Sequence, residues 1–194
     1  MYAPLLGLSV AFGTFFAYAG AAPATDPRRL DVTVCLLPGG PVPEINYART
    51  IAGSILRKAG IQLRWRLGLP KRGDGTGLKL IVAEIVPDAP PDVPPFVRAR
   101  SFLSSGGASR MIIYRRRVMN DSCPETCGFE SGAMMGHVLA HEITHVLQGF
   151  AHHAADGLMR ARWTADDVYR MQTRTLSLAS EDVELIWEAV DRER

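Results

Sequence analysis

The sequence has almost no net charge and very few cysteines. Its 22 Lys and Arg residues are balanced by 20 Asp and Glu residues, so the formal net charge is +2. This balance excludes the strongly basic surface that nucleic-acid-binding domains present, and we expect no nucleic-acid partner. Hydrophobic residues make up 47% of the 194 positions, which excludes a disordered chain and is enough for one domain with its own core.

The three cysteines are too few for a disulfide framework. Cys35 lies in an apolar run, residues 32–37, and we interpret it as a buried core thiol. Cys123 and Cys127 flank a three-residue loop that could close as a disulfide, and the sequence leaves that pairing open. A single C-x₃-C pair has no second pair with which to complete a cysteine-based metal site.

The first 25 residues carry no charged side chain. Within them, residues 5–17 form an apolar run of the length found in signal peptides, and small residues suited to cleavage follow. We therefore predict a cleaved signal peptide over residues 1–24, a single domain over residues 25–194, and a secreted or periplasmic protein without a stable membrane span. The alternative is an uncleaved N-terminal anchor, since residues 5–22 approach the roughly 20 apolar residues that a spanning helix needs.

The rest of the chain alternates between two hydrophobic periods. Alternating or β-branched apolar runs predict strands at residues 30–37, 61–67, 78–86, 96–103 and 111–119. Apolar residues three and four apart predict helices at residues 45–56, 131–149 and 164–176, and from residue 180 onward. This order of elements predicts an α+β fold in which helices cover a sheet.

Two segments need a separate interpretation. Residues 87–95 contain five prolines and predict an exposed connection rather than a central strand. Arg115, Arg116 and Arg117 lie within the last predicted strand. We interpret these arginines as charges that protect an edge strand from aggregation, rather than as an anion site.

A short motif in the long predicted helix points to a metal. In His141-Glu142-Ile143-Thr144-His145, the two histidines stand four residues apart on one helical face, where both imidazoles can reach one ion. Glu142 lies between them and can act on a metal-activated water without binding the metal. We predict a Zn²⁺ site with His141 and His145 as ligands and Glu142 as the general base. His137, one turn earlier, is interpreted as structural.

The third protein ligand of a catalytic zinc ion is expected in the residues after the helix. His152 and His153 both follow Gly149, which should end the helix and let the chain turn back. The motif and this turn resemble the metzincin zinc endopeptidases, whose signature is H-E-x-x-H-x-x-G-x-x-H followed by a methionine turn. Gly149 stands one place late for that signature, and the metzincin step counted from it would select His152.

A longer pattern, H-E-x-x-H-x-x-x-G-x-x-x-H-x-x-x-G-x-M, is typical of a group of exported bacterial metzincin-like proteins. The chain matches every fixed position of this pattern, including His153, Gly157 and Met159. The resemblance therefore favours His153 as the third ligand. It also implies a mixed twisted sheet with a backing helix, an active-site helix beneath the sheet, and C-terminal helices.

The same resemblance implies an activity and a mode of substrate binding. It predicts a zinc-dependent endopeptidase that acts on peptide or protein substrates, and we expect a monomer. An extended peptide would add to an edge strand above the cleft, and that edge is expected between Arg98 and Tyr114.

Two other functions stay open at this point. The first is a secreted binding protein that keeps zinc for stability without turnover; Glu142 argues against it, because a structural site has no use for that carboxylate. The second is a gluzincin-like hydrolase, in which Glu181 or Glu184 supplies an acidic third ligand. Two adjacent histidines after Gly149 argue against that alternative.

Overall fold

The computed structural model describes residues 28–74, 79–104, 107–122 and 128–193. The predicted signal peptide and the pair Cys123 and Cys127 lie outside these residues. Among the described residues, no helix combines the length and hydrophobicity that crossing a membrane requires. Cys35 is a buried free thiol, as predicted, and burial raises its pKa.

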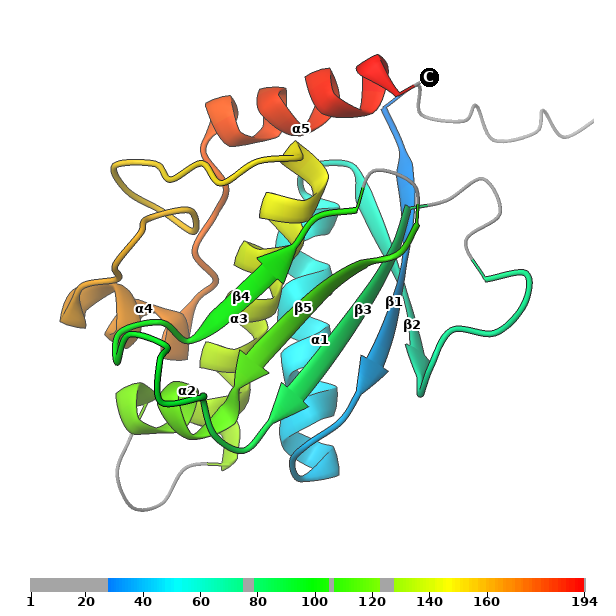
Figure 1. The fold of residues 1–194 in the computed structure, drawn as a ribbon. Coiled ribbons are helices and arrows are strands. Elements are labelled where there is room, and N and C mark those ends of the chain that lie inside the picture. The colour runs from blue at the N-terminus through cyan, green and yellow to red at the C-terminus, as the bar shows by residue number, and fades with distance from the viewer. Residues whose placement is uncertain (1–27, 75–78, 105–106, 123–127, 194) are drawn as a thin grey trace, which may run out of the picture.

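Five strands form one twisted mixed sheet (Figure 1). They are β1 (Leu30–Leu37), β2 (Ile61–Leu67), β3 (Lys79–Val86), β4 (Ala99–Phe102) and β5 (Ser109–Tyr114). Their order across the sheet is β2-β1-β3-β5-β4, and β4 is the edge strand that runs antiparallel to its neighbour. β1 pairs with a parallel strand along each of its edges, and residues 32–36 are all buried, so both of its faces are covered, in keeping with its continuous apolar run.

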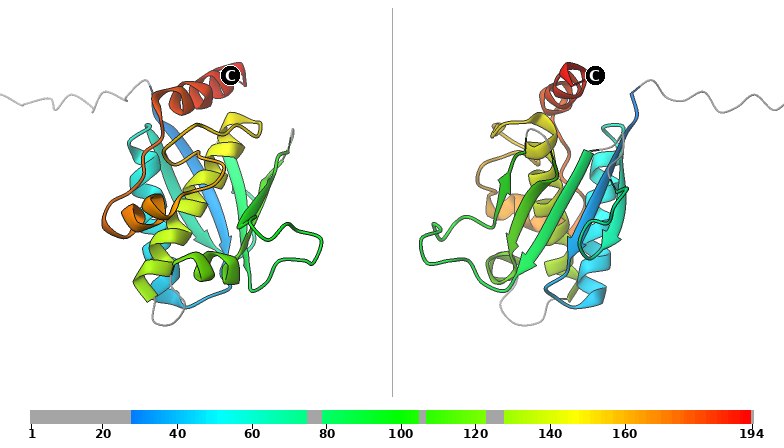
Figure 2. Two further views of the ribbon diagram at one scale, coloured as in Figure 1. Left: turned by 90° about the vertical axis from the view of Figure 1, so that its left-hand side faces the viewer. Right: turned by 45° about the vertical axis from the view of Figure 1, so that its right-hand side comes forward.

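Two long helices cover the same face of this sheet (Figure 2). α1 (Val42–Arg57) connects β1 to β2, and α3 (Gly128–Gln148) packs beside α1 and against β4. α2 (Arg115–Ser122) precedes α3, while α4 (Ala165–Thr173) and α5 (Ser180–Arg192) follow it and pack against it. The predicted α+β fold with helices on a mixed sheet is confirmed, and β1 and β2 have the predicted bounds.

The second half of one predicted strand is wrong. We expected a strand over residues 111–119, but β5 ends at Tyr114 and α2 begins at Arg115. β4 covers β5 in the sheet order, so the arginines do not protect an edge strand. Arginine is a good helix former, and a partner outside the sheet holds each of the three.

These partners anchor α2 and the proline-rich connection. Arg115 forms a 2.6 Å ion pair with the buried Glu44 in the first turn of α1. Arg116 pairs with Asp88 at 2.9 Å. Arg117 donates to the carbonyl oxygens of Val93, Pro94 and Val97. The triple arginine therefore has a structural role, and the connection at residues 87–95 contains no strand, as predicted.

α3 and α1 approach closely because two glycines of α3 face α1. A Cβ atom on Gly136 would lie 2.6 Å from Cβ of Ile51 and 2.8 Å from the carbonyl oxygen of Ala48. A Cβ atom on Gly132 would lie 3.1 Å from the carbonyl oxygen of Glu44. Larger residues at these positions would push the two helices apart, because a close-packed interior has no room for the extra atoms.

We expect Gly136→Ala to destabilise the protein, although alanine is the better helix former by about 1 kcal/mol. The added methyl group must displace the backbone of α1, and overpacking of this kind costs about 1–3 kcal/mol. Gly53→Ala in α1 is the matched control, because a Cβ atom there meets nothing within 4 Å; it should stabilise by up to about 1 kcal/mol. Urea unfolding measures both changes. Equal stabilisation in the two variants would contradict the close helix packing.

α4 begins with a capping box formed by Thr164 and Asp167. The Thr164 hydroxyl accepts from the backbone N–H of Asp167, and the Asp167 carboxylate accepts from the backbone N–H of Thr164 at 2.9 Å. The same carboxylate, fully buried, also accepts from Arg160 at 2.6 Å and from Arg170. Burial alone would raise the pKa of Asp167, but these hydrogen bonds outweigh burial and lower it to about 2.

Because of this carboxylate, the free energy of unfolding should decrease in acid. Because the folded pKa lies below the ordinary value of 3.8, ionised Asp167 stabilises the fold above about pH 4, and the contribution disappears as the pH falls toward about 2. We expect Asp167→Asn to cost about 1–3 kcal/mol at pH 7 and to weaken the fall in stability between pH 4 and pH 2. Asp166→Asn is the control, because Asp166 is exposed. Unfolding curves at several pH values test this; an unchanged acid dependence in Asp167→Asn would contradict it.

Candidate metal centre

α3 carries the two motif histidines on the face that is turned toward β4. Residues 131–148 of this helix are buried throughout, so His141 and His145 are polar groups in an otherwise packed element. His141 is 9% exposed and His145 is 8% exposed. Their spacing of one helical turn brings their Nε2 atoms to 3.0 Å from each other.

The chain after α3 fixes the orientation of His141. Nδ1 of His141 donates to the carbonyl oxygen of Leu158 at 2.9 Å, because a carbonyl can only accept. Nε2 therefore carries the lone pair and faces His145. Trp163 donates to the same carbonyl from its indole nitrogen at 3.0 Å, and its ring centroid lies 5.6 Å from that of His141.

His153 joins the two helical histidines, and His152 does not. The helix ends before Gly149, whose φ of +80° lets the chain turn back as predicted. The ring centroid of His153 then lies 4.9 Å from that of His145 and 5.5 Å from that of His141. One ring nitrogen from each of the three histidines lies within 4.8 Å of the others. His152 instead directs Nε2 toward Asp182 on α5, at 3.8 Å.

The three imidazoles suit a zinc ion in charge and in spacing. Burial lowers the pKa of His141 to about 4 and that of His145 to about 3, and it also lowers the pKa of His153. The rings are therefore neutral at pH 7, as metal ligands must be. Two nitrogens on one tetrahedral zinc ion are about 3.3 Å apart, close to the 3.0 Å between His141 and His145.

Glu142 lies beside this cluster but outside it, because the group of potential ligand atoms contains only the histidines. Its carboxylate accepts a short hydrogen bond at Oε2 from the hydroxyl of Ser101 on β4. Burial raises the pKa of Glu142 to about 7, although the Ser101 hydrogen bond acts in the opposite direction. Sequence reasoning missed Ser101; the available signal was its place in the expected edge segment.

Three residues that the sequence analysis considered, His137, Glu181 and Glu184, do not join the ligand group. Nδ1 of His137 donates to the carbonyl of Ala133 at 2.7 Å, and its Nε2 accepts from the backbone N–H of Leu176 at 3.0 Å. His137 thus ties α3 to the chain after α4, which is the structural role expected. Glu181 and Glu184 are exposed on α5 and are absent from the ligand group of the described residues.

The turn after His153 is held in place by a backbone hydrogen bond and by close contact with the chain near Ser177. Met159 is fully buried, and its carbonyl accepts from the backbone N–H of Ala154 at 2.9 Å. Gly157 has a φ of +71°, and a Cβ atom there would lie 2.8 Å from the carbonyl oxygen of Ser177. These contacts hold Leu158 in place, and its carbonyl oxygen in turn orients His141.

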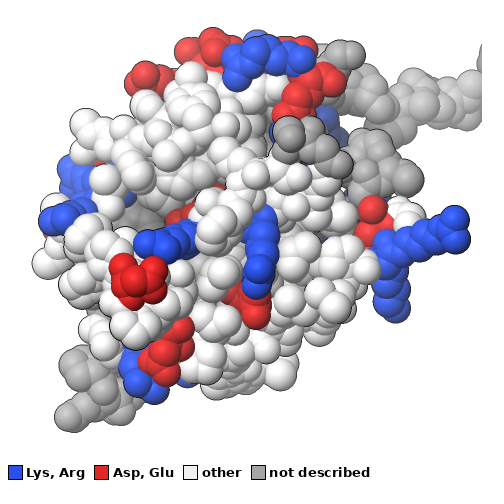
Figure 3. Space-filling model, viewed as in Figure 1, with Lys and Arg blue, Asp and Glu red and all other residues white. Residues whose placement is uncertain are grey.

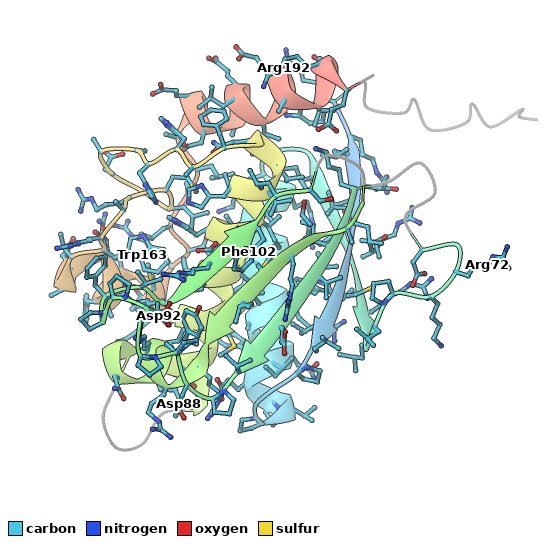
Figure 4. All side chains as sticks on the ribbon, viewed as in Figure 1. Arg72, Asp88, Asp92, Phe102, Trp163 and Arg192 are labelled. Carbon is cyan, nitrogen blue, oxygen red and sulfur yellow. The ribbon has the colours of Figure 1, made fainter. Side chains whose placement is uncertain are left out.

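The histidines and Glu142 open into a cleft of about 460 Å³. α3 contributes its floor, residues 96–103 line one side, and residues between 150 and 163 line the other. Figure 4 marks these sides by Phe102 on β4 and Trp163 before α4. The predicted edge strand is confirmed as β4, directly beside this cleft. The arrangement can hold one metal ion with a position left open to a ligand from the cleft.

The comparisons with known proteins concern the fold. No protein-family model matches the sequence, and no curated protein sequence matches it either. Among solved structures, the chain is similar to archaemetzincin from Methanopyrus kandleri, with a TM-score of 0.54 and 12% sequence identity over 87% of this chain and 99% of that chain. At this identity the likeness is one of fold. The chain has the metzincin-like α+β fold that the motif resemblance implies.

Proposed function

We propose that this chain is a zinc-dependent endopeptidase, with His141, His145 and His153 as the metal ligands and Glu142 as the general base. The observation that carries the proposal is the convergence of three neutral imidazoles within 4.8 Å beside a carboxylate that does not belong to the ligand group. A structural zinc site would close with a fourth protein ligand. Here the cleft reaches the histidines instead.

The residues divide the chemistry between them. Zinc, when bound, supplies a Lewis acid that polarises a peptide carbonyl and makes water more acidic. Glu142 takes the proton of the attacking water and passes it to the leaving amine. Ser101 donates to Oε2 of Glu142, which holds the carboxylate in one orientation and leaves Oε1 to receive the proton.

An extended substrate fits the free edge of β4. Tyr114 donates its backbone N–H to the carbonyl of Arg98 at 2.8 Å, and the register pairs Arg100 with Ile112. Because hydrogen bonding alternates along an antiparallel pair, the backbone groups of Ala99 and Ser101 point away from β5. These groups supply donors and acceptors for a peptide strand laid in the cleft.

The test is metal analysis together with peptide cleavage by the purified chain without residues 1–24. We expect about one zinc ion per chain and cleavage of internal bonds in a mixed peptide library. Removing the metal with a chelator should abolish cleavage, and added Zn²⁺ should restore it. Stoichiometric zinc with no cleavage of any peptide would favour a zinc-stabilised binding protein, and the absence of zinc would refute the site.

We also propose that the protein is exported to the periplasm or the medium, which rests on the uncharged apolar segment before Asp26. N-terminal sequencing of the protein recovered outside the cytoplasm tests this. A mature terminus near residue 25 is expected. An intact Met1 on membrane-bound protein would support the anchor instead.

A further inference from the structure

The cleft and its edge strand carry an excess of arginine. Four arginines line the cleft, and Glu142 is the one carboxylate among the described residues that do so. The lining arginines are Arg98, Arg100, Arg160 and Arg162. Charges of both signs are interspersed over the face shown in Figure 3, so this excess is local and does not reflect a general positive field.

The four arginines differ in how far their charge is already balanced. Arg160 is neutralised by the buried carboxylate of Asp167 at 2.6 Å. The guanidinium of Arg98 lies over the ring of Trp163, 5.6 Å from its centroid, and that of Arg162 lies 4.2 Å from the ring centroid of Phe96. The contact with Phe96 orients the guanidinium of Arg162 but leaves its charge in place.

Arg100 is the arginine placed beside a bound peptide. Successive side chains of a strand point to opposite faces, and Ser101 contacts Glu142 on the face toward α3. Arg100 and the half-exposed Phe102 therefore point to the other face. Among the described residues Arg100 forms no ion pair, whereas Arg110 on the neighbouring strand pairs with Glu84.

We propose that the edge of β4 selects peptides with an acidic side chain on the face turned away from α3, and that Arg100 is the residue that selects it. This inference rests on the proposed function. A peptide strand paired with the free edge of β4 would place every second side chain on the face of Arg100, about 5 Å from its cross-strand neighbour. A carboxylate there balances a half-buried guanidinium, while an ammonium group in the same place is repelled.

The experiment compares peptides that differ at one position. Sets of internally quenched peptides carry Glu, Gln or Lys at each position around the cleaved bond, and kcat/KM is measured for the zinc-loaded protein. At one position at least, we expect Glu to exceed Gln by about threefold to tenfold and Gln to exceed Lys. Arg100→Gln should remove this difference, and Arg100→Glu should reverse it in favour of Lys. Arg116→Gln is the matched control, because Arg116 pairs with Asp88 on the surface and should leave the order unchanged.

A binding measurement separates this inference from the proposed catalysis. The same peptides, labelled and without a quencher, are titrated into the Glu142→Gln protein, and Kd is read from fluorescence anisotropy at low and high salt. Tighter binding of the Glu peptide, weakened by salt and lost in the double variant with Arg100→Gln, supports the inference even if no peptide is cleaved. Equal Kd values for Glu, Gln and Lys peptides, or a preference that survives Arg100→Gln, would overturn it. Metal-dependent cleavage with no charge preference would leave the proposed function intact.

Discussion

Glu142→Gln should bind zinc as the parent does and lose almost all hydrolysis. The amide keeps the size of the side chain and can still accept a hydrogen bond from Ser101, but it cannot take a proton from water. General base catalysis contributes about 10²–10⁴-fold to rates, so we expect kcat to fall by at least about 100-fold. Metal content, unfolding temperature and peptide cleavage are measured on the same preparation.

The contrast between metal content and activity is what makes this variant informative. The three histidines form the ligand group without Glu142, so the metal content should not change. Loss of zinc in Glu142→Gln as complete as in a variant that lacks both His141 and His145 would make Glu142 a ligand and refute its assigned role. Full activity with retained zinc would require another general base.

His153→Ala should lose zinc affinity far more than His152→Ala. The ring of His153 lies 4.9 Å from that of His145, whereas His152 is directed toward Asp182. Removing an outer partner of a metal site weakens binding by about 10–100-fold, and removing a ligand should exceed that range. Competition with a zinc-sensitive chelator measures both affinities.

His152→Ala is a matched control for His153→Ala, because the two histidines are neighbours in sequence but have different surroundings. Each substitution removes one imidazole from the same loop and leaves Gly149 and its turn intact. His152→Ala loses the approach to Asp182 but keeps the N-terminal contact of α5, in which the Asp182 carboxylate accepts from the N–H of Ala179 at 3.0 Å. A large loss in His152→Ala together with normal binding in His153→Ala would reverse the assignment.

Much of the fold follows from local patterns in the sequence. β1 and β2 match their predicted bounds because a continuous buried run and a strict alternation are strong signals. The end of α3 was predictable because Gly149 adopts a φ that other residues avoid. Thr164 was predictable as an N-cap because its hydroxyl competes for the free N–H groups of a helix start.

The features that sequence reasoning missed depend on contacts between distant segments. α2 could not be distinguished from a continuing strand, because the partners of its arginines, such as Glu44 and Asp88, come from other parts of the chain. Ser101 and Trp163 reach the site only once β4 and the turn after His153 are packed against α3. Spacing alone could relate His141 to His145, but the place of His153 required the longer pattern.

The glycines at the back of α3 bear on the width of the cleft at its front. Gly132 precedes His141 by nine residues and Gly136 precedes His145 by nine, which is half a turn out of phase at 3.6 residues per turn. The side of the helix that touches α1 is therefore opposite the side that carries the imidazoles. A residue that separates α3 from α1 would therefore act on both histidines together, from the side opposite the imidazoles. The width of the cleft that a substrate backbone can enter therefore depends on Gly132 and Gly136, because their lack of side chains lets α3 lie close to α1.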